Sequence, residues 1–233
     1  MDAMTHVLSV VIVTEPIRYS LERSRLSVQA DEPEQASLLR PPVAWRFYLA
    51  MGLAALLPDI DGALGVPDAM GWTQLGWYAR YHRVITHSIP GLVFFAAVAA
   101  LLGAFWPQKW MLPFVRRIDS RGDAGRRYSG SGAWPFLFLM ALIGVTLHVI
   151  EDGVTAWGTL RLFWPVSDWD FQLNRVNSLE PWILAFTLAI WAVQHLLLQM
   201  KRLRAGYAMT LLWVLAFVAY VWLRPIYGPK PYV

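Results

Sequence analysis

The segment HRVITHS (residues 82–88) runs directly into the apolar segment IPGLVFFAAVAALLGAFW (residues 89–106), with no loop between them. Ser88 followed by Pro90 is typical of a helix N-cap and a first-turn proline, so a helix is predicted to begin just after His87. The apolar segment is long enough to cross a bilayer, which takes about 17–25 largely apolar residues. Ionisable side chains at a membrane edge are costly and are rarely found there without a partner. The sequence therefore predicts a membrane helix with a polar site at one end.

The composition is that of a membrane protein. Of 233 residues, 57% are hydrophobic and 15% charged, with a mean hydropathy of +0.41. A soluble domain is typically about 45–50% apolar and about 25% charged. Thirteen tryptophans and nine tyrosines suit anchoring at the membrane interface. There is no cysteine, which excludes disulfides, thiolate metal ligands and a cysteine nucleophile.

We expect an all-α, polytopic helical membrane protein with about five spanning helices plus a short N-terminal helix. The expected short helix covers residues 7–13 and is only partly inserted. The expected spans are residues 45–57, 89–106, 134–150, 181–200 and 207–223. We treat residues 1–233 as a single domain, with the core motifs in 4–165 and a C-terminal loop and two spanning helices in 166–233.

Charged segments predict the orientation. Residues 14–43 and 108–133 have the composition of exposed connectors, and neither alternates aromatics with arginines as a single-strand nucleic-acid site does. If residues 14–46, 108–133 and 201–204 share one side, that side holds 14 of the 20 Lys and Arg residues. Basic residues accumulate in cytoplasmic loops, so the polar clusters are expected on the non-cytoplasmic face of the inner (plasma) membrane. The first residues lack a basic n-region, so no cleavable signal peptide is expected.

Two clusters contain carboxylates in positions that suit a metal. His148 and Asp152 are four residues apart and would share one helix face, with Thr155 nearby. Asp59 and Asp61 follow a proline, so both carboxylates are expected on one turn, where they chelate one ion or bridge two. The alternatives are a polar pair at a helix end and a solvated turn.

The third cluster contains His82 and His87, which are five residues apart and fit a loop and the first turn of the next helix. Between them Arg83 is a candidate for binding a phosphate or carboxylate, because guanidinium forms bidentate pairs with such groups. The alternative is that these histidines are structural. His195 lies far from the clusters and is interpreted as a packed or interfacial histidine.

Oxygen and nitrogen donors without sulfur suit zinc, with manganese or iron as alternatives. The number of candidate ligands exceeds the three or four that one zinc ion needs, so two ions are expected. His6 joins the others if the first helix runs inward from the same face. The candidate metal ligands are His6, Asp59, Asp61, His82, His87, His148 and Asp152.

At these residues the sequence resembles the YdjM-like family of inner-membrane, metal-dependent hydrolases, which are described as LexA-regulated. The matching motifs are Met4-Thr5-His6, residues 56–61, residues 82–88, residues 148–158 and residues 162–165. The resemblance implies an α-helical membrane protein with a metal site at the seven residues above. The family is also distantly similar to zinc-dependent phospholipases C and single-strand nucleases. The segment 14–43 is a long insertion relative to the family pattern.

Our hypothesis is therefore a membrane-bound hydrolase that cleaves a phosphoester in a lipid-derived or other small-molecule substrate. Its expected catalytic residues are Asp59, Asp61 and Arg83, its partners are membrane lipids, and no nucleic acid is expected. Two bound ions would activate water and stabilise the leaving oxygen. The alternatives are a metal-binding transporter and a scaffold in which the metal only joins helices. A transporter should have polar residues deep in its spans, and residues 89–106 and 207–223 offer almost none.

Overall fold

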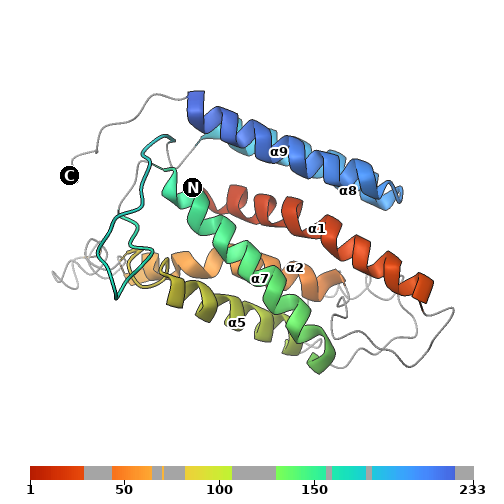
Figure 1. Cartoon of the computed structure of the whole chain (residues 1–233), viewed down its shortest axis with the longest axis horizontal. Helices are drawn as coiled ribbons and strands as arrows, with labels where there is room; N and C mark the ends of the chain where they lie inside the picture. The colour runs from red at the N-terminus through yellow and green to blue at the C-terminus, as the bar shows by residue number, and fades with distance from the viewer. Residues whose placement is uncertain are drawn as a thin grey trace.

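The computed structural model describes residues 1–28, 44–64, 70, 82–106, 130–155, 159–176 and 180–223. The regular structure in these ranges is α-helices and one 3₁₀ helix, with an isolated bridge between Thr155 and Val176 and no β-strand. Residues 82–88 and 159–176 form turns and irregular chain. The all-α prediction is confirmed. The elements, drawn in Figure 1, are α1 (Ala3–Val28), α2 (Ala44–Leu56), η1 (Leu57–Leu64), α5 (Ile89–Phe105), α7 (Gly130–Gly153), α8 (Pro181–Gln199) and α9 (Leu203–Leu223).

Helix α1 lies between two parts of the bundle. It packs against α2 and α7 on one side and against the α8–α9 hairpin on the other (Figure 1). Helix α5 packs against α7 and α2 and completes the first part. Successive helices run in opposite directions, so one end of the bundle collects the start of α1, η1, the residues before α5 and the end of α7.

Large and small apolar residues together fill the core of α1, α2, α5 and α7. Phe47, Met51 and Phe136 are fully buried there. At Gly144 of α7 a Cβ would lie 2.9 Å from a methyl carbon of Val10 in α1, so this glycine permits the close approach of the two helices. The core therefore holds the N-terminal end of α1 against the C-terminal half of α7.

Fewer helices than expected are long enough to span a membrane. In the described part of the chain, three segments have the length and apolar character of a span: Trp134–Gly153, Pro181–Gln199 and Leu203–Leu223. Ile89–Phe105 is a shorter apolar helix. Helix α2 has 13 residues and is only about 20 Å long, less than the ~30 Å hydrocarbon core of a bilayer. Insertion of the bundle in a membrane is supported, but the count of five full spans is not.

The N-terminal helix is longer than predicted. Helix α1 has 26 residues, so the prediction of a short helix over 7–13 followed by an exposed connector is wrong for residues 14–28. The buried side chains of Glu15 and Arg18 explain the difference. The hydroxyl of Tyr48 in α2 donates to Glu15, whose Oε1 also lies 3.0 Å from Nδ1 of His195 in α8. The remainder of the predicted connectors, residues 29–43 and 107–129, lies outside the described residues.

Pro16 within α1 creates a second link to the α8–α9 hairpin. Proline has no N–H, so the carbonyl of Ile12 loses its usual donor four residues on. Gln194 Nε2 of α8 and Thr210 Oγ1 of α9 both donate to this carbonyl, each at 2.9 Å. The α8–α9 hairpin thus supplies hydrogen-bond donors to the Ile12 carbonyl, which has no donor within α1.

Candidate metal centre

All seven predicted metal ligands meet at one end of the bundle. His6 lies near the start of α1, Asp59 and Asp61 lie in η1, and His148 and Asp152 lie in the last turns of α7. His82 and His87 lie in the turn before α5. Four segments that are far apart in the sequence therefore supply one polar cluster, as the sequence predicted.

The turn before α5 is fixed by the start of that helix. The Ser88 hydroxyl accepts a hydrogen bond from the Gly91 amide, and Pro90 lies in the first turn, so the predicted helix start after His87 is confirmed. An ideal Cβ on Gly91 would lie 2.3 Å from the carbonyl oxygen of Ile85. Glycine at this position therefore lets the turn lie directly against α5.

Four side chains have the spacing of ligands around one ion. Nε2 of His87 lies 3.2 Å from Nε2 of His148, 3.1 Å from Asp152 Oδ2 and 3.7 Å from Asp59 Oδ1. Nε2 of His148 lies 3.5 Å from Asp59 Oδ1 and 3.6 Å from Asp152 Oδ2. Ligands about 2.0–2.1 Å from a tetrahedral zinc ion are about 3.3 Å from one another. Five of the six edges of such a tetrahedron are therefore close to their expected length.

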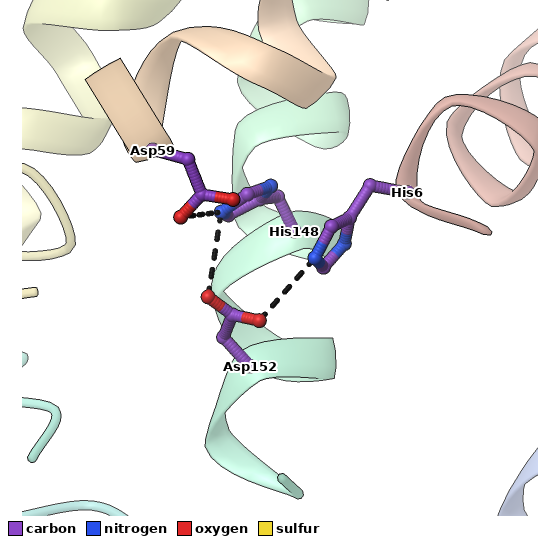
Figure 2. Close-up of side chains that lie close together, drawn as sticks. All are labelled: His6, Asp59, His148 and Asp152. Atoms are coloured by element: carbon purple, nitrogen blue, oxygen red, sulfur yellow. Dashed lines mark ion pairs between the residues drawn. The ribbon is translucent and has the colours of Figure 1, made fainter. Parts of the chain in front are cut away.

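His6 adjoins this group from the other side. Its ring stacks on that of His148 with centroids 4.0 Å apart, and its Nε2 lies 3.2 Å from Asp152 Oδ1. Figure 2 shows His6, Asp59, His148 and Asp152 directed toward one another from α1, η1 and α7. The amino group of Met1 also contacts Asp152. His6 therefore lies beside the other candidate ligands.

Three imidazoles are oriented by partners outside the cluster. Nδ1 of His148 lies 2.7 Å from the Ala55 carbonyl oxygen, and Nδ1 of His6 lies 2.6 Å from Glu151 Oε2. Nδ1 of His87 lies 2.8 Å from the Thr86 hydroxyl. Partners of this kind fix the ring orientation and tautomer of metal-binding histidines.

The donor atoms fit a divalent cation. The Thr86 hydroxyl donates to Asp61 Oδ2, so it accepts from His87 Nδ1–H, and His148 Nδ1–H must donate to the Ala55 carbonyl. Both Nε2 atoms are then lone-pair acceptors, 3.2 Å apart, and a cation between them removes their repulsion. Buried Nε2 of His6 and Oδ1 of Asp59 make no well-aligned hydrogen bond, although Asp152 Oδ1 lies 3.2 Å from the first and His148 Nε2 lies 3.5 Å from the second. These residues fit a metal ion.

The two aspartates of η1 differ in their surroundings. Asp61 is buried and accepts hydrogen bonds from the Arg83 amide at 3.0 Å and from Thr86 at 2.7 Å, and its Oδ1 lies 2.9 Å from His82 Nδ1. Burial favours the neutral acid, but the interactions with His82 and Thr86 outweigh it and lower the pKa of Asp61. Asp59 is more exposed, and its Oδ1 lies 3.5 Å from Nε2 of His148 and 3.7 Å from Nε2 of His87. Both groups are therefore carboxylates ready to bind a cation.

Arg83 lies inside the cluster. Its Nη2 lies 2.8 Å from Asp152 Oδ2, and its Nη1 donates to the Thr155 hydroxyl at 3.3 Å. The residue is buried and has a positive φ of 60°, which is uncommon for a residue other than glycine. The hydrogen bond from its backbone N–H to Asp61 and its ion pair with Asp152 hold this conformation. Arg83 thus joins the carboxylates of η1 and α7.

Sequence reasoning missed the outer partners of the histidines. Glu151 belongs to the quoted motif, and its position three residues after His148 was the available signal. Thr86 also lies within a motif, but its two hydrogen bonds depend on tertiary structure, as does the carbonyl of Ala55. His195 stacks on Trp191 and is 36% exposed, which fits its interpretation as a packed or interfacial histidine.

The comparisons with known proteins agree with this arrangement. The model of a family described as YdjM inner membrane protein matches residues 1–226. The chain belongs to the YdjM inner membrane protein family. The resemblance drawn from the motifs is confirmed, and the three apolar helices fit an inner-membrane location.

The chain is also similar to "Uncharacterized protein YfhP" of Bacillus subtilis (strain 168). The two are 29% identical over 156 residues, which cover 66% of this chain and 38% of that protein. The chain thus spans well under half of that relative's length. No solved structure matches.

Proposed function

We propose that this YdjM family protein is a metal-dependent hydrolase that cleaves a phosphoester in a lipid-derived substrate. The observation that supports the proposal is the position of Asp59, whose carboxylate belongs to two groups of side chains that could each hold a metal ion. Pairs of ions about 3.5–4 Å apart are typical of phosphatases and nucleases. A single carboxylate can bridge two ions at that separation, with one oxygen on each.

The proposed cofactor is a pair of divalent ions, zinc by preference and manganese or iron as alternatives. Imidazole with carboxylate suits all three metals. When bound, such ions would activate water and neutralise charge on a phosphate. The ligands would be the seven residues predicted from the sequence.

The chain's own residues would position the substrate. Asp59 is the most exposed of the seven, with 36% of its side chain accessible, so it marks the side from which a substrate would approach. Asp61 would keep His82 in place through the contact at 2.9 Å. Arg83 would balance the negative charge of a phosphate while it stays paired with Asp152.

Exposed apolar side chains near the centre support a lipid-derived substrate. Leu56 and Ile60 flank Asp59, and Ile85 and Ile89 flank His87, and all four are exposed. A membrane lipid would place its headgroup at the carboxylates and its acyl chains along this apolar rim. The proposal puts the site on the non-cytoplasmic face.

The test is hydrolysis by the purified, metal-loaded protein across a panel of phosphodiesters, phosphomonoesters and phospholipids. We expect turnover that chelation abolishes and that added zinc or manganese restores. Asp59→Asn should abolish turnover, because a neutral amide bridges cations poorly, whereas Asp168→Asn at the exposed ion pair with Arg161 should not. Metal-loaded protein that hydrolyses no member of the panel would instead be a binding or scaffold protein.

A further inference from the structure

The metal-binding side chains form two groups that share one carboxylate. The inner group combines His6, His148 and Asp152 with Asp59, and His87 contacts three of these four residues. The outer group combines Asp59 with Asp61 and His82. Within each group the donor atoms lie within 4.8 Å of one another.

The groups differ in burial and in the number of donors. The side chains of His6, His87, His148 and Asp152 have no exposed surface. In the outer group the side chain of His82 is 11% exposed and that of Asp59 36%. The inner group can occupy all four coordination positions of a tetrahedral ion with protein ligands, whereas the outer group offers only three protein ligands. Structural zinc sites are closed by four protein ligands, whereas sites with three protein ligands leave a position for water or substrate. The inner group is therefore expected to hold its ion more firmly.

The groups also differ in donor type. The inner group presents three imidazole nitrogens and two carboxylates, a set that suits zinc or iron. The outer group presents two carboxylates and a single imidazole, which is closer to the oxygen-rich sets that suit manganese or magnesium. The outer position is therefore expected to take the harder cation.

One hydroxyl connects the two groups directly. Thr86 accepts from His87 Nδ1–H of the inner group and donates to Asp61 Oδ2 of the outer group, at 2.8 and 2.7 Å. Because Thr86 has a single proton, both bonds form together only when His87 carries its proton on Nδ1. That tautomer directs the lone pair of Nε2 toward the inner position.

We propose that the two positions are unequal: the inner group retains one ion, and the outer group binds a second, exchangeable divalent cation on which activity depends. Thr86 is the positioning residue that links them. The dependence of activity on the outer cation rests on the proposed function. The order in which the two ions bind rests on the donor groups alone. The protein would then be regulated by the supply of the outer cation.

Counting ions tests the proposal. The intact protein is loaded with Zn²⁺, dialysed against a mild chelator, analysed for metal and titrated with Mn²⁺ followed by electron paramagnetic resonance. We expect one retained zinc and one reversibly bound manganese per chain. His82→Ala should lose only the manganese, and His148→Ala should lose the retained zinc. Loss of both ions together, retention of both, or a total that never exceeds one would overturn the proposal.

Thr86 is tested with two substitutions. Thr86→Val should weaken Mn²⁺ binding about 10–100-fold, the effect usual for removing a partner of a ligand. Thr86→Ser keeps the hydroxyl and should restore the affinity, which loss of packing alone would not explain. Equal Mn²⁺ affinity in Thr86→Val and wild type would remove Thr86 from the proposal.

Activity separates this inference from the proposed function. Turnover that rises in proportion to manganese occupancy supports both. Full turnover with the retained zinc alone would contradict the dependence of activity on the outer cation but leave the hydrolase intact. Stepwise binding without hydrolysis of any substrate would support the unequal positions and contradict the hydrolase, together with the regulation of its activity.

Discussion

A side chain at position 91 would collide with the turn that carries Thr86 and His87. An ideal Cβ on Gly91 lies 2.3 Å from the Ile85 carbonyl oxygen and 2.5 Å from that of Thr86, and backbone atoms at such distances must move. We predict that Gly91→Ala lowers both the metal content and the melting temperature. The control is Gly52→Ala in α2, where a Cβ meets nothing within 4 Å and alanine favours the helix by about 1 kcal/mol. Metal content and melting temperature of Gly91→Ala equal to those of wild type would show that the turn moves freely.

Arg83 tests whether a residue of the cluster acts on substrate or only on structure. Arg83→Lys keeps the charge beside Asp152 but loses the planar fork that also reaches Thr155. We expect metal content to be kept and turnover to fall by about 10²–10³, by analogy with the loss of an oxyanion donor. Metal content, melting temperature and turnover should be measured on the same preparation. A lower melting point with unchanged turnover would reduce Arg83 to a brace between Asp61 and Asp152.

For single residues, the sequence identified the histidines and aspartates of the site but missed residues whose role depends only on a tertiary contact. Histidines and aspartates at the ends of apolar runs are unusual enough to predict a site, and all seven meet. The roles of Thr86 and Ala55 depend on which atoms the fold brings to His87 and His148. A threonine or a backbone carbonyl has no distinctive pattern in sequence.

Helix α1 depends on its neighbours to satisfy one of its own backbone groups. The Ile12 carbonyl that Pro16 leaves without a donor is bound by Gln194 and by Thr210. Replacing both, as Gln194→Leu with Thr210→Val, leaves a buried carbonyl without a partner and should destabilise the bundle by about 1–3 kcal/mol. Thermal unfolding in detergent measures the change.

Pro16→Ala in the doubly substituted background provides the control. Alanine restores an N–H that can donate to the Ile12 carbonyl within the helix, so part of the lost stability should return. If the same Pro16→Ala change stabilises the original chain equally, the link between α1 and the hairpin is not a matter of this carbonyl.

Helix ends were predictable where local signals exist. Ser88 and Pro90 gave the start of α5, and Pro181 gave the start of α8, because caps and first-turn prolines act within one turn. The extent of α1 was not predictable, since Glu15 and Arg18 look like solvated residues until Tyr48 and His195 are placed beside them. Charged residues in a sequence indicate an exposed loop only if no other part of the fold supplies them with a hydrogen-bond or ion-pair partner.

At the scale of the whole molecule, alternating helix direction separates the chain into two ends. The candidate metal ligands lie at one end of the bundle, where α7 finishes and α1 begins (Figure 1). The turn between α8 and α9, which contains Lys201, lies at the other, and Arg46 at the start of α2 lies there too. In the described part of the bundle, Lys201 and Arg46 thus lie at the end opposite to the candidate ligands, as the predicted membrane orientation requires.

That orientation is a prediction of its own. Even without residues 14–28 of α1, the segments 29–46, 108–133 and 201–204 hold 11 of the 20 Lys and Arg residues. They are expected in the cytoplasm, so the centre would face the other side. A reporter that is active only in the cytoplasm should be active when inserted at Arg121 and inactive at Gly71. A reporter that is active only outside should give the reverse, and both insertion points lie outside the described residues. Because Gly71 lies between η1 and His82, cytoplasmic activity there would put the centre in the cytoplasm. Its substrates and metal supply would then be cytoplasmic as well, which the charge distribution argues against.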